Sequence, residues 1–327
     1  RLGIAHILAI SGLHLGLVAG AMVLLLRLIG DHPRLESLVV LVTLIASLGW
    51  FFSSEALTGM PPLLFIALRF LFSGLLLLML GWRGLRGRSR RELLAIVPAG
   101  LAFAGGMMCW ILGLQYSTHM GIGAFILSLN FLLVPLLGLL FGERPGLMHW
   151  LALPVALVGV ACLLLEDGFV FGPGEFYIAL SALLFALFLN LNSTAARRIP
   201  ALGLVAVQQL MVAVVVLPLS LLFEGQGMTA SLAVWGWLMA SVLLSTSGRF
   251  VLQTWAQGRT SASNVALILV LEPVWVALLG LFWLGQGMSM LQLLGCALIF
   301  SAVLLGRSKA ILVRMRAVPA RSTRQPV

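Results

Sequence analysis

The sequence predicts an all-helical membrane protein with ten transmembrane helices in two inverted five-helix repeats, preceded by one extra apolar helix. Three observations predict this fold. Of the 327 residues, 61% are hydrophobic and 9% are charged, whereas soluble domains have roughly 25% charged residues. Apolar runs long enough to cross a bilayer alternate with short polar connections. The second half of the chain also resembles the first.

Residues that interrupt apolar helices separate the predicted spans. These breaks are Pro61-Pro62, the arginine cluster after Trp82, Gly142 with Pro145, and Gly172-Pro173-Gly174. A helix needs about 20 apolar residues to cross the bilayer. The ten predicted spans are 38–56, 62–81, 93–114, 120–141, 147–165, 175–193, 203–223, 233–255, 262–284 and 289–306. The extra apolar segment, 4–28, precedes them.

Basic residues gather in alternate connections, which indicates how the chain is oriented. One set of connections and the C-terminal tail hold Arg83, Arg86, Arg88, Arg90, Arg91, Arg144, Arg197, Arg198, Arg259, Arg307, Lys309, Arg314, Arg316, Arg321 and Arg324. The other connections hold Glu55, Glu166, Asp167, Glu175 and Glu224, without a lysine or arginine. Because positive loops stay in the cytoplasm, we expect a multi-pass protein of the bacterial inner membrane with both ends of the ten-span block cytoplasmic.

Composition and motifs also exclude several classes of function. The net charge of +10 is explained by topology, and the basic tail lacks interleaved aromatic residues, so no nucleic-acid partner is expected. A phosphate-cradling glycine loop with lysine and a histidine–carboxylate metal spacing are both absent from the sequence. We therefore predict no enzyme activity, no cofactor and no metal. The three cysteines, Cys109, Cys162 and Cys296, lie in apolar runs and are interpreted as core residues.

The two halves match at an almost constant offset. A shift of 143 residues places Glu143 on Gln286, and a shift of 142 places Gln115 on Gln257. Since each half holds five spans, the second half must enter the bilayer in the opposite orientation, as in many secondary transporters with a binding site near the midplane. The predicted units are an apolar segment (1–36), a first repeat (37–168), a second repeat (169–308) and a cytoplasmic tail (309–327).

Three stretches resemble a known family. They are PPLLFIALRFLFSGLLLLML from Pro61, LQYSTHMGIGAFILSLNFLLVPLLGLLFGERP from Leu114, and TSASNVALILVLEPVWVALLGLFWLGQGMSMLQLLGCALIFSAVLL from Thr260. In this order they resemble EamA-type ten-span permeases of the drug/metabolite transporter superfamily. The resemblance implies a secondary transporter that exports amino acids or related small metabolites and drugs by alternating access. One difference is Gln286, where the family usually has glutamate.

The N-terminal segment carries a second, shorter resemblance. GIAHILAISGLHLGLVAG, from Gly3, is similar to the opening of the membrane domain of ComEC-type competence proteins, with His6, Ser11 and His14 roughly on one helical face. We interpret residues 1–36 as a fusion or junction remnant. The resemblance leaves a component of a DNA-uptake channel as an alternative function, and a non-transporting membrane scaffold is a third.

Charged residues inside the spans are the first candidates for a site. A charge at the bilayer centre costs about 2.5–3.5 kcal/mol, so it should face a cavity or a partner. Glu272, followed by Pro273, is a candidate proton or substrate-amine site, or else a structural partner of Arg249 or of unpaired backbone amides. Arg249 is itself a candidate for substrate binding. Arg69 and Glu143, together with Pro273, are assigned structural or gating roles.

Uncharged side chains complete the predicted site. Asn130 is the preferred one, because it occupies the counterpart of the Glu272-Pro273 site in the other repeat. The remaining binding candidates are Trp50, Ser53, Trp110, Gln115, Asn190 and Gln253, and further pocket candidates are Asn192, Trp255, Gln257 and Trp275. Tyr116 and Trp150 are instead interpreted as interface anchors. The expected partners are a small solute and the lipid bilayer, with a proton as candidate coupling ion and a homodimer as candidate assembly.

Overall fold

The computed structural model describes residues 33–116, 125–164, 172–224, 231–275, 278 and 289–306. Every regular element in this part of the chain is a helix, which confirms the predicted fold class. The segment 1–32, with its ComEC-like sequence, and the tail from residue 307 lie outside the described residues. The side chains of Trp50 and Gln115 and the whole of Gln286 also lie outside them.

The helices of the first repeat follow the predicted spans. They are α2 (Pro33–Ala56), α3 (Pro62–Leu85), α4 (Arg90–Leu94), α5 (Ile96–Tyr116), α7 (Asn130–Gly138) with the 3-10 turn η1 (Leu139–Phe141), and α8 (Leu147–Leu164). Proline suits the first turn of α3, where its missing N–H needs no partner. Gly142 ends η1 with φ of 79°, a left-handed conformation that glycine adopts without strain.

The described helices of the second repeat also follow the predicted spans, and the third of these spans contains a π-helix. Its helices are α9 (Pro173–Ala196), α10 (Ala201–Phe223), α11 (Leu232–Ala240), the π-helix η2 (Ser241–Gly248), α12 (Arg249–Gln257), α13 (Ala262–Leu269) and α15 (Met290–Gly306). The predicted span 233–255 is thus α11, η2 and α12 in sequence. A π-helix has wider turns than an α-helix and is frequent at functional sites.

The apolar character of the helices confirms an integral membrane protein. By length and composition, four helices can cross a bilayer: Pro62–Leu85, Arg90–Gly113, Pro173–Ala196 and Ala201–Phe223. Shorter apolar helices lie in five of the six other predicted spans, all except 233–255. Large apolar side chains point outward, such as Met79 (82% exposed), Leu140 (81%) and Leu232 (90%). Large exposed apolar patches mark an interaction surface or a membrane, and here the surface fits lipid.

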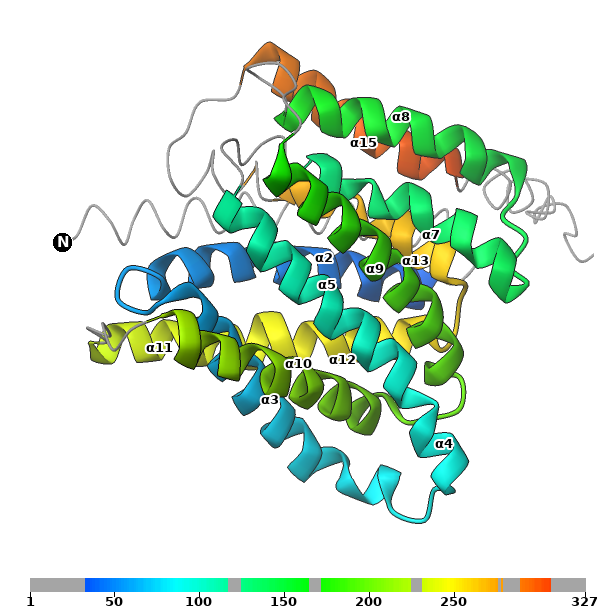
Figure 1. The fold of residues 1–327 in the computed structure, drawn as a ribbon. Helices are drawn as coiled ribbons and strands as arrows, with labels where there is room; N and C mark the ends of the chain where they lie inside the picture. The colour runs from blue at the N-terminus through cyan, green and yellow to red at the C-terminus, as the bar shows by residue number, and fades with distance from the viewer. Residues whose placement is uncertain are drawn as a thin grey trace, which may run out of the picture.

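The bundle has two ends of different composition. At the arginine-rich end, which holds connections 86–89, 142–146, 197–200 and 258–261, Arg88 Nη1 donates to the carbonyl of Arg198 at 3.1 Å. At the opposite end, the rings of Tyr116 and Tyr177 stack with centroids 6.1 Å apart. In Figure 1 the arginine-rich end lies at the right and the opposite end at the left. The arginines of four separate connections therefore gather at one end.

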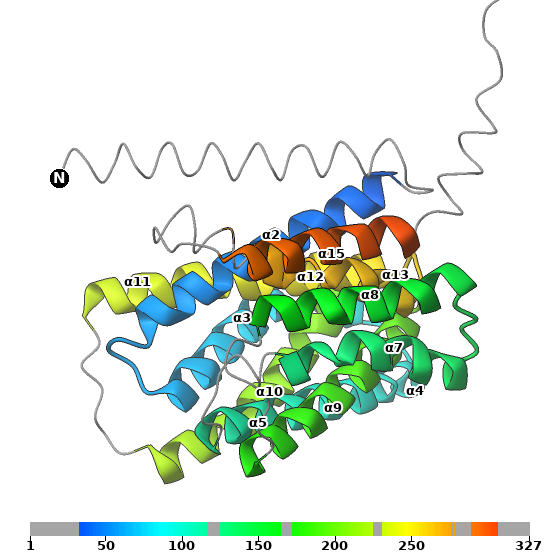
Figure 2. The ribbon, with the colours of Figure 1, turned by 90° about the horizontal axis from the view of Figure 1, so that it is seen from above.

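The direction of equivalent helices shows the inversion of the repeats. Helix α2 begins at the arginine-rich end and leads to connection 57–61, whereas α9 begins at the opposite end and leads to connection 197–200 (Figure 1). Two pairs of equivalent helices also pack extensively on each other, α3 on α10 and α8 on α15 (Figure 2), and α5 packs on α9 to a similar extent. A two-fold axis in the membrane plane would produce this arrangement.

Close backbone contact holds α8 against α15. A Cβ atom added at Gly159 would lie 2.8 Å from the carbonyl oxygen of Gly295 and 2.9 Å from the amide nitrogen of Ile299. Small residues allow this approach between membrane helices, whose packing depends on van der Waals contact and hydrogen bonds. The glycine is required here because the neighbouring atoms are backbone and cannot rotate away.

We expect Gly159→Ala to lower the free energy of unfolding by about 1–2 kcal/mol, because the added methyl group separates the two helices. Gly236→Ala is the matched control, since a Cβ atom there meets nothing within 4 Å and alanine favours the helix. Thermal unfolding in detergent measures both variants. Equal transition temperatures for the two variants would contradict the close contact.

Candidate functional site

Three charged side chains meet in the interior of the bundle. Arg249 Nη2 lies 2.8 Å from Glu272 Oε2, so the two residues form an ion pair. Arg69, from the other repeat, interacts electrostatically with both of them. Since Arg69 belongs to α3 and the pair belongs to α12 and the segment after α13, the charges lie where the repeats meet.

A break in the helix places Glu272. Helix α13 ends at Leu269, residues 270 and 271 form a turn, and helical structure resumes at Glu272. Pro273 has no N–H, so the carbonyl of Leu269 loses its usual donor and the regular hydrogen-bond pattern stops there. Broken helices in membranes are tolerated where protein or water satisfies the freed backbone groups. The proline therefore explains why the irregular backbone coincides with the charged residue.

The π-helix η2 places Arg249 and supplies hydroxyl groups. Ser245 Oγ and Thr246 Oγ1 both donate to the carbonyl of Ser241, at 3.0 Å and 2.9 Å. Such back-bonding competes with the regular α-helical pattern. Arg249 follows directly as the first residue of α12, so the serine-rich sequence sets both the irregular turn and the position of the cation.

Arg69 connects three helical segments. Its Nε donates to Thr246 Oγ1, its Nη1 to Ser53 Oγ at 3.2 Å, and its Nη2 to Ser245 Oγ at 3.3 Å. Helix α2 can approach η2 this closely because Gly49 has no side chain; a Cβ atom there would lie 2.6 Å from Ser245 Cβ. Arg69 thereby joins α2, α3 and η2 through neutral partners.

A second polar contact occupies the equivalent place in the other repeat. Ser53 and Arg69 lie eight residues before and after Pro61, and Asn192 and Gln208 lie eight residues before and after Pro200. Gln208 Nε2 donates to Asn192 Oδ1 at 2.9 Å, just as Arg69 donates to Ser53. Gln208 is not among the residues predicted from the sequence, and its equal spacing with Asn192 around Pro200 is the signal that could have found it.

The second contact also reaches the third span of its own repeat. Asn192 Nδ2 donates to Thr254 Oγ1 at 3.0 Å and to Gln257 Oε1. All of these side chains are buried. Helices α9, α10 and α12 are therefore joined near the arginine-rich end by amide groups, whereas Arg69 joins α2, α3 and η2 nearer the opposite end.

We expect Gln208→Ala to lower the free energy of unfolding by about 1–2 kcal/mol, because Asn192 Oδ1 loses its donor while it stays buried. A double-mutant cycle with Asn192→Ala should give a coupling energy of about 1 kcal/mol. The measurement is chemical unfolding in detergent micelles. Simple additivity of the two single changes would show that the contact contributes nothing.

Several buried polar atoms have no hydrogen-bond partner among the described residues. They are Asn130 Oδ1, Asn190 Oδ1, Ser193 Oγ, both amide atoms of Gln209, Arg249 Nε, Gln253 Oε1 and Gln257 Nε2. An unsatisfied buried polar group costs about 1–3 kcal/mol, so water or a solute is the natural partner for such atoms. Four of the predicted binding residues, Asn130, Asn190, Gln253 and Arg249, belong to this set.

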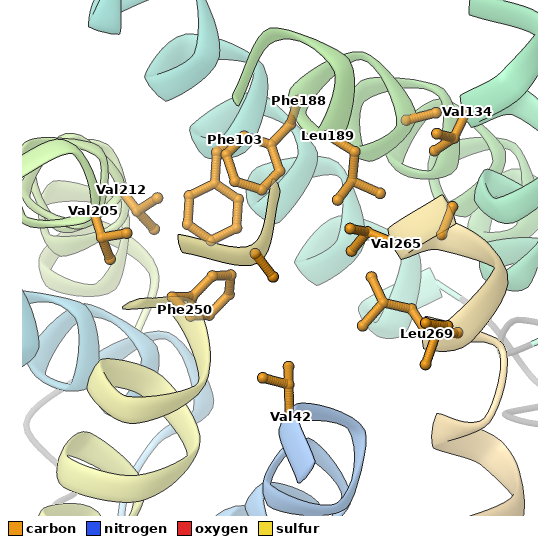
Figure 3. Close-up of a cluster of buried hydrophobic side chains, with 14 of the residues drawn as sticks. Val42, Phe103, Val134, Phe188, Leu189, Val205, Val212, Phe250, Val265 and Leu269 are labelled. Carbon is orange, nitrogen blue, oxygen red and sulfur yellow. The ribbon is translucent and has the colours of Figure 1, made fainter. Parts of the chain in front are cut away.

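Aromatic side chains surround the centre of this polar region. The Phe103 ring stacks on Phe188 with centroids 4.6 Å apart and lies 5.2 Å from Phe250, as Figure 3 shows. Phe70 is 5.5 Å from Phe103. The Arg249 guanidinium carbon is 5.3 Å from the Phe250 ring centre. The aromatic cluster, Phe70, Phe103, Phe188 and Phe250, therefore combines helices of both repeats and lies next to the cation.

The remaining predicted residues lie in different surroundings. Trp110 is half-buried against the main core. Trp275 is fully buried and its Nε1 donates to Thr43 Oγ1 at 2.8 Å, which joins the segment after α13 to α2. Asn190 Nδ2 donates to the carbonyls of Val134 and Ala186, both at 3.0 Å. These contacts connect helices and do not reach the charged residues.

Two carboxylates clamp the repeats together, one at each end of the bundle. Glu143, after η1, accepts from the amide of Ala262 at 2.7 Å and from Ser263 Oγ at 2.7 Å, at the start of α13. Glu224, after α10, accepts from the amides of Leu63 and Leu64 at 2.6 and 2.8 Å, at the start of α3. Carboxylates are favourable at helix N-termini. Each clamp joins one repeat to the other.

Comparison with known proteins agrees with this architecture. The sequence model of the EamA-like transporter family matches residues 34–165 and 172–306. An uncharacterized transporter of Archaeoglobus fulgidus is 26% identical over 194 residues, which is 58% of this chain and 67% of the relative. A crystal structure at 20% identity shares the fold with a TM-score of 0.73, covering 85% of this chain and 98% of that chain. Two copies of the family's sequence pattern thus coincide with the two sets of five helices, and the chain belongs to the EamA-like transporter family.

Proposed function

We propose that this membrane transporter is a secondary transporter of the bacterial inner membrane that exports amino acids or related small metabolites by alternating access. The observation that carries the proposal is the meeting of Arg69, Arg249 and Glu272 between the two repeats. Charges inside spans are costly and mark solute or ion pathways, and inverted repeats provide the two exchangeable shapes that alternating access requires.

The orientation follows from the arginine-rich end, which we assign to the cytoplasm. In this orientation the Glu143 clamp closes the cytoplasmic end and the Glu224 clamp holds the periplasmic end. Alternating access then requires the contacts at one end to open while those at the other stay closed. Glu272 is the candidate carrier of a coupling proton, since it is the acidic residue in the interior of a span.

Counterflow in proteoliposomes tests the proposal. Vesicles that hold the purified chain and unlabelled amino acids should take up external labelled amino acid faster than empty vesicles. Glu272→Gln and Asn130→Ala should reduce this flux while the amount of folded protein stays the same. Full flux in both variants would remove the site assignment, and no flux for any amino acid in the panel would contradict the proposed solute class.

Cysteine labelling tests the orientation separately. Single cysteines placed at Arg86 and Arg198 should react with an impermeant reagent from the cytoplasmic side alone. Labelling of the two positions from different sides would contradict the inverted arrangement in the membrane.

A further inference from the structure

We infer that the solute is an organic anion with a carboxylate and an apolar or aromatic body, and that Arg69 receives its carboxylate. The inference rests on the proposed transport function and narrows the proposed solutes, amino acids and related small metabolites, to those with net negative charge. It follows from the balance of charge at the meeting point of the repeats and from the unused donors of one side chain.

The charged residues at this point do not balance. Arg69 and Arg249 contribute two positive charges and Glu272 contributes one negative charge. The other nine of the ten acidic residues in the sequence lie at the ends of predicted spans or between them. A buried charge without a counter-charge is costly. The centre of the protein therefore carries one positive charge that a solute anion can neutralise.

Of the two interior arginines, Arg69 is the one without an ion pair to a carboxylate among the described residues. Its three hydrogen bonds go to the hydroxyls of Ser53, Ser245 and Thr246. Each of these hydroxyls donates its own proton to a backbone carbonyl, so toward Arg69 they act as acceptors. They orient the guanidinium with neutral dipoles but provide no opposite charge.

The Arg69 guanidinium also has N–H groups that make no hydrogen bond to the described residues. It carries five N–H groups, and three are used, so one on each terminal nitrogen has no partner among the described residues. Two N–H groups on a planar guanidinium suit the two oxygens of a carboxylate. Glu272 already accepts a hydrogen bond from Arg249. A solute ammonium group would therefore have to compete with Arg249 for this carboxylate, whereas a solute carboxylate meets unused donors on Arg69. This difference favours an anion over a zwitterion.

The surroundings of Arg69 indicate the rest of the solute. The guanidinium carbon lies 5.8 Å from the Phe65 ring centre and 6.0 Å from that of Phe70. Phe70 continues into the aromatic cluster through Phe103 and Phe250. Because apolar rings flank the cation on this side, an apolar or aromatic body fits better than a second charged group.

Three probes with one skeleton test the inference: phenylacetate (an anion), phenylacetamide (neutral) and phenylglycine (a zwitterion at neutral pH). Binding to the purified full chain is measured by tryptophan fluorescence, and transport by counterflow. Phenylacetate should bind at least about tenfold tighter than either of the others. Arg69→Gln should remove this preference, and Arg83→Gln, at an exposed arginine, should leave it unchanged.

Arg69→Lys keeps the positive charge but loses the planar guanidinium that can bind both carboxylate oxygens. This variant should therefore bind phenylacetate more weakly than the unmodified protein does, and should still bind it more tightly than the other two probes. If Arg69→Gln does not fold, the order of the three binding affinities in the unmodified protein and in Arg69→Lys tests the inference. The inference is overturned if phenylglycine or phenylacetamide binds more tightly than phenylacetate. It is also overturned if none of the three probes binds. Counterflow of phenylglycine alone would keep the transport function and reject the anion, whereas binding of phenylacetate without any counterflow would keep the anion site and reject transport.

Discussion

Glu272→Ala is expected to lower the free energy of unfolding by about 3 kcal/mol, because it leaves the Arg249 guanidinium inside the bundle without its carboxylate. The value lies at the lower end for buried pairs, since 17% of the Glu272 side chain and 21% of the Arg249 side chain are exposed. Arg249→Ala should have a similar effect. Thermal unfolding in detergent measures both variants.

The exposed pair Arg88–Glu92, with 3.2 Å between the charged atoms, is the matched control. Glu92→Ala removes one partner of that pair at the surface, together with the hydrogen bonds that Glu92 accepts from Ser89, and it should lower stability far less than Glu272→Ala because a surface pair contributes little. The double change Arg249→Met with Glu272→Met should recover stability and still abolish transport, because the site loses its charges. Equal shifts in transition temperature for Glu272→Ala and Glu92→Ala would contradict a buried ion pair.

Glu143→Ala is expected to lower the free energy of unfolding by about 2–3 kcal/mol, because the amide of Ala262 and the hydroxyl of Ser263 lose a charged acceptor. The start of α13 should loosen first, since this carboxylate satisfies its first donors. Hydrogen–deuterium exchange measured on a peptide that covers Ala262 and Ser263 should become faster.

Glu143→Gln is the informative companion, because the glutamine oxygen can still accept from the amide of Ala262 but carries no charge. Its exchange rate should lie between those of the unmodified protein and Glu143→Ala. Exchange in the peptide covering residues 63 and 64, which the Glu224 clamp protects, should not change in either variant. Unaltered exchange at the start of α13 in Glu143→Ala would show that the clamp does not hold this helix.

Most of the fold could be predicted because membrane helices are local features. Apolar runs and their proline and glycine breaks depend on neighbouring residues alone, and the helices at Pro62, Pro173 and Ala201 begin within two residues of the predicted spans. The inversion followed from an odd number of spans. The π-helix was not predicted, because the sequence Ser245-Thr246-Ser247-Gly248 signals a polar break without specifying how the backbone winds.

The candidate site was less accessible to prediction, because it depends on contacts between distant segments. The pairing of Arg249 with Glu272 was one of two alternatives from the sequence, and the structure shows that pair without deciding whether Glu272 also binds protons or solute. The partners of Arg69 come from α2 and η2, and no local pattern relates residues so far apart. The contact between Asn192 and Gln208 could be found from the sequence only by aligning the helix pair around Pro200 with the helix pair around Pro61.

The π-helix has a mechanical consequence for the cation that follows it. An α-helix turns about 100° per residue, since it has 3.6 residues per turn, and a wide turn holds a surplus residue relative to that winding. If η2 tightened into regular α-helix, Arg249 would rotate by about 100° around the helix axis, away from Glu272. A change in winding between α11 and α12 can thus redirect the charge of Arg249 relative to the first half of the span.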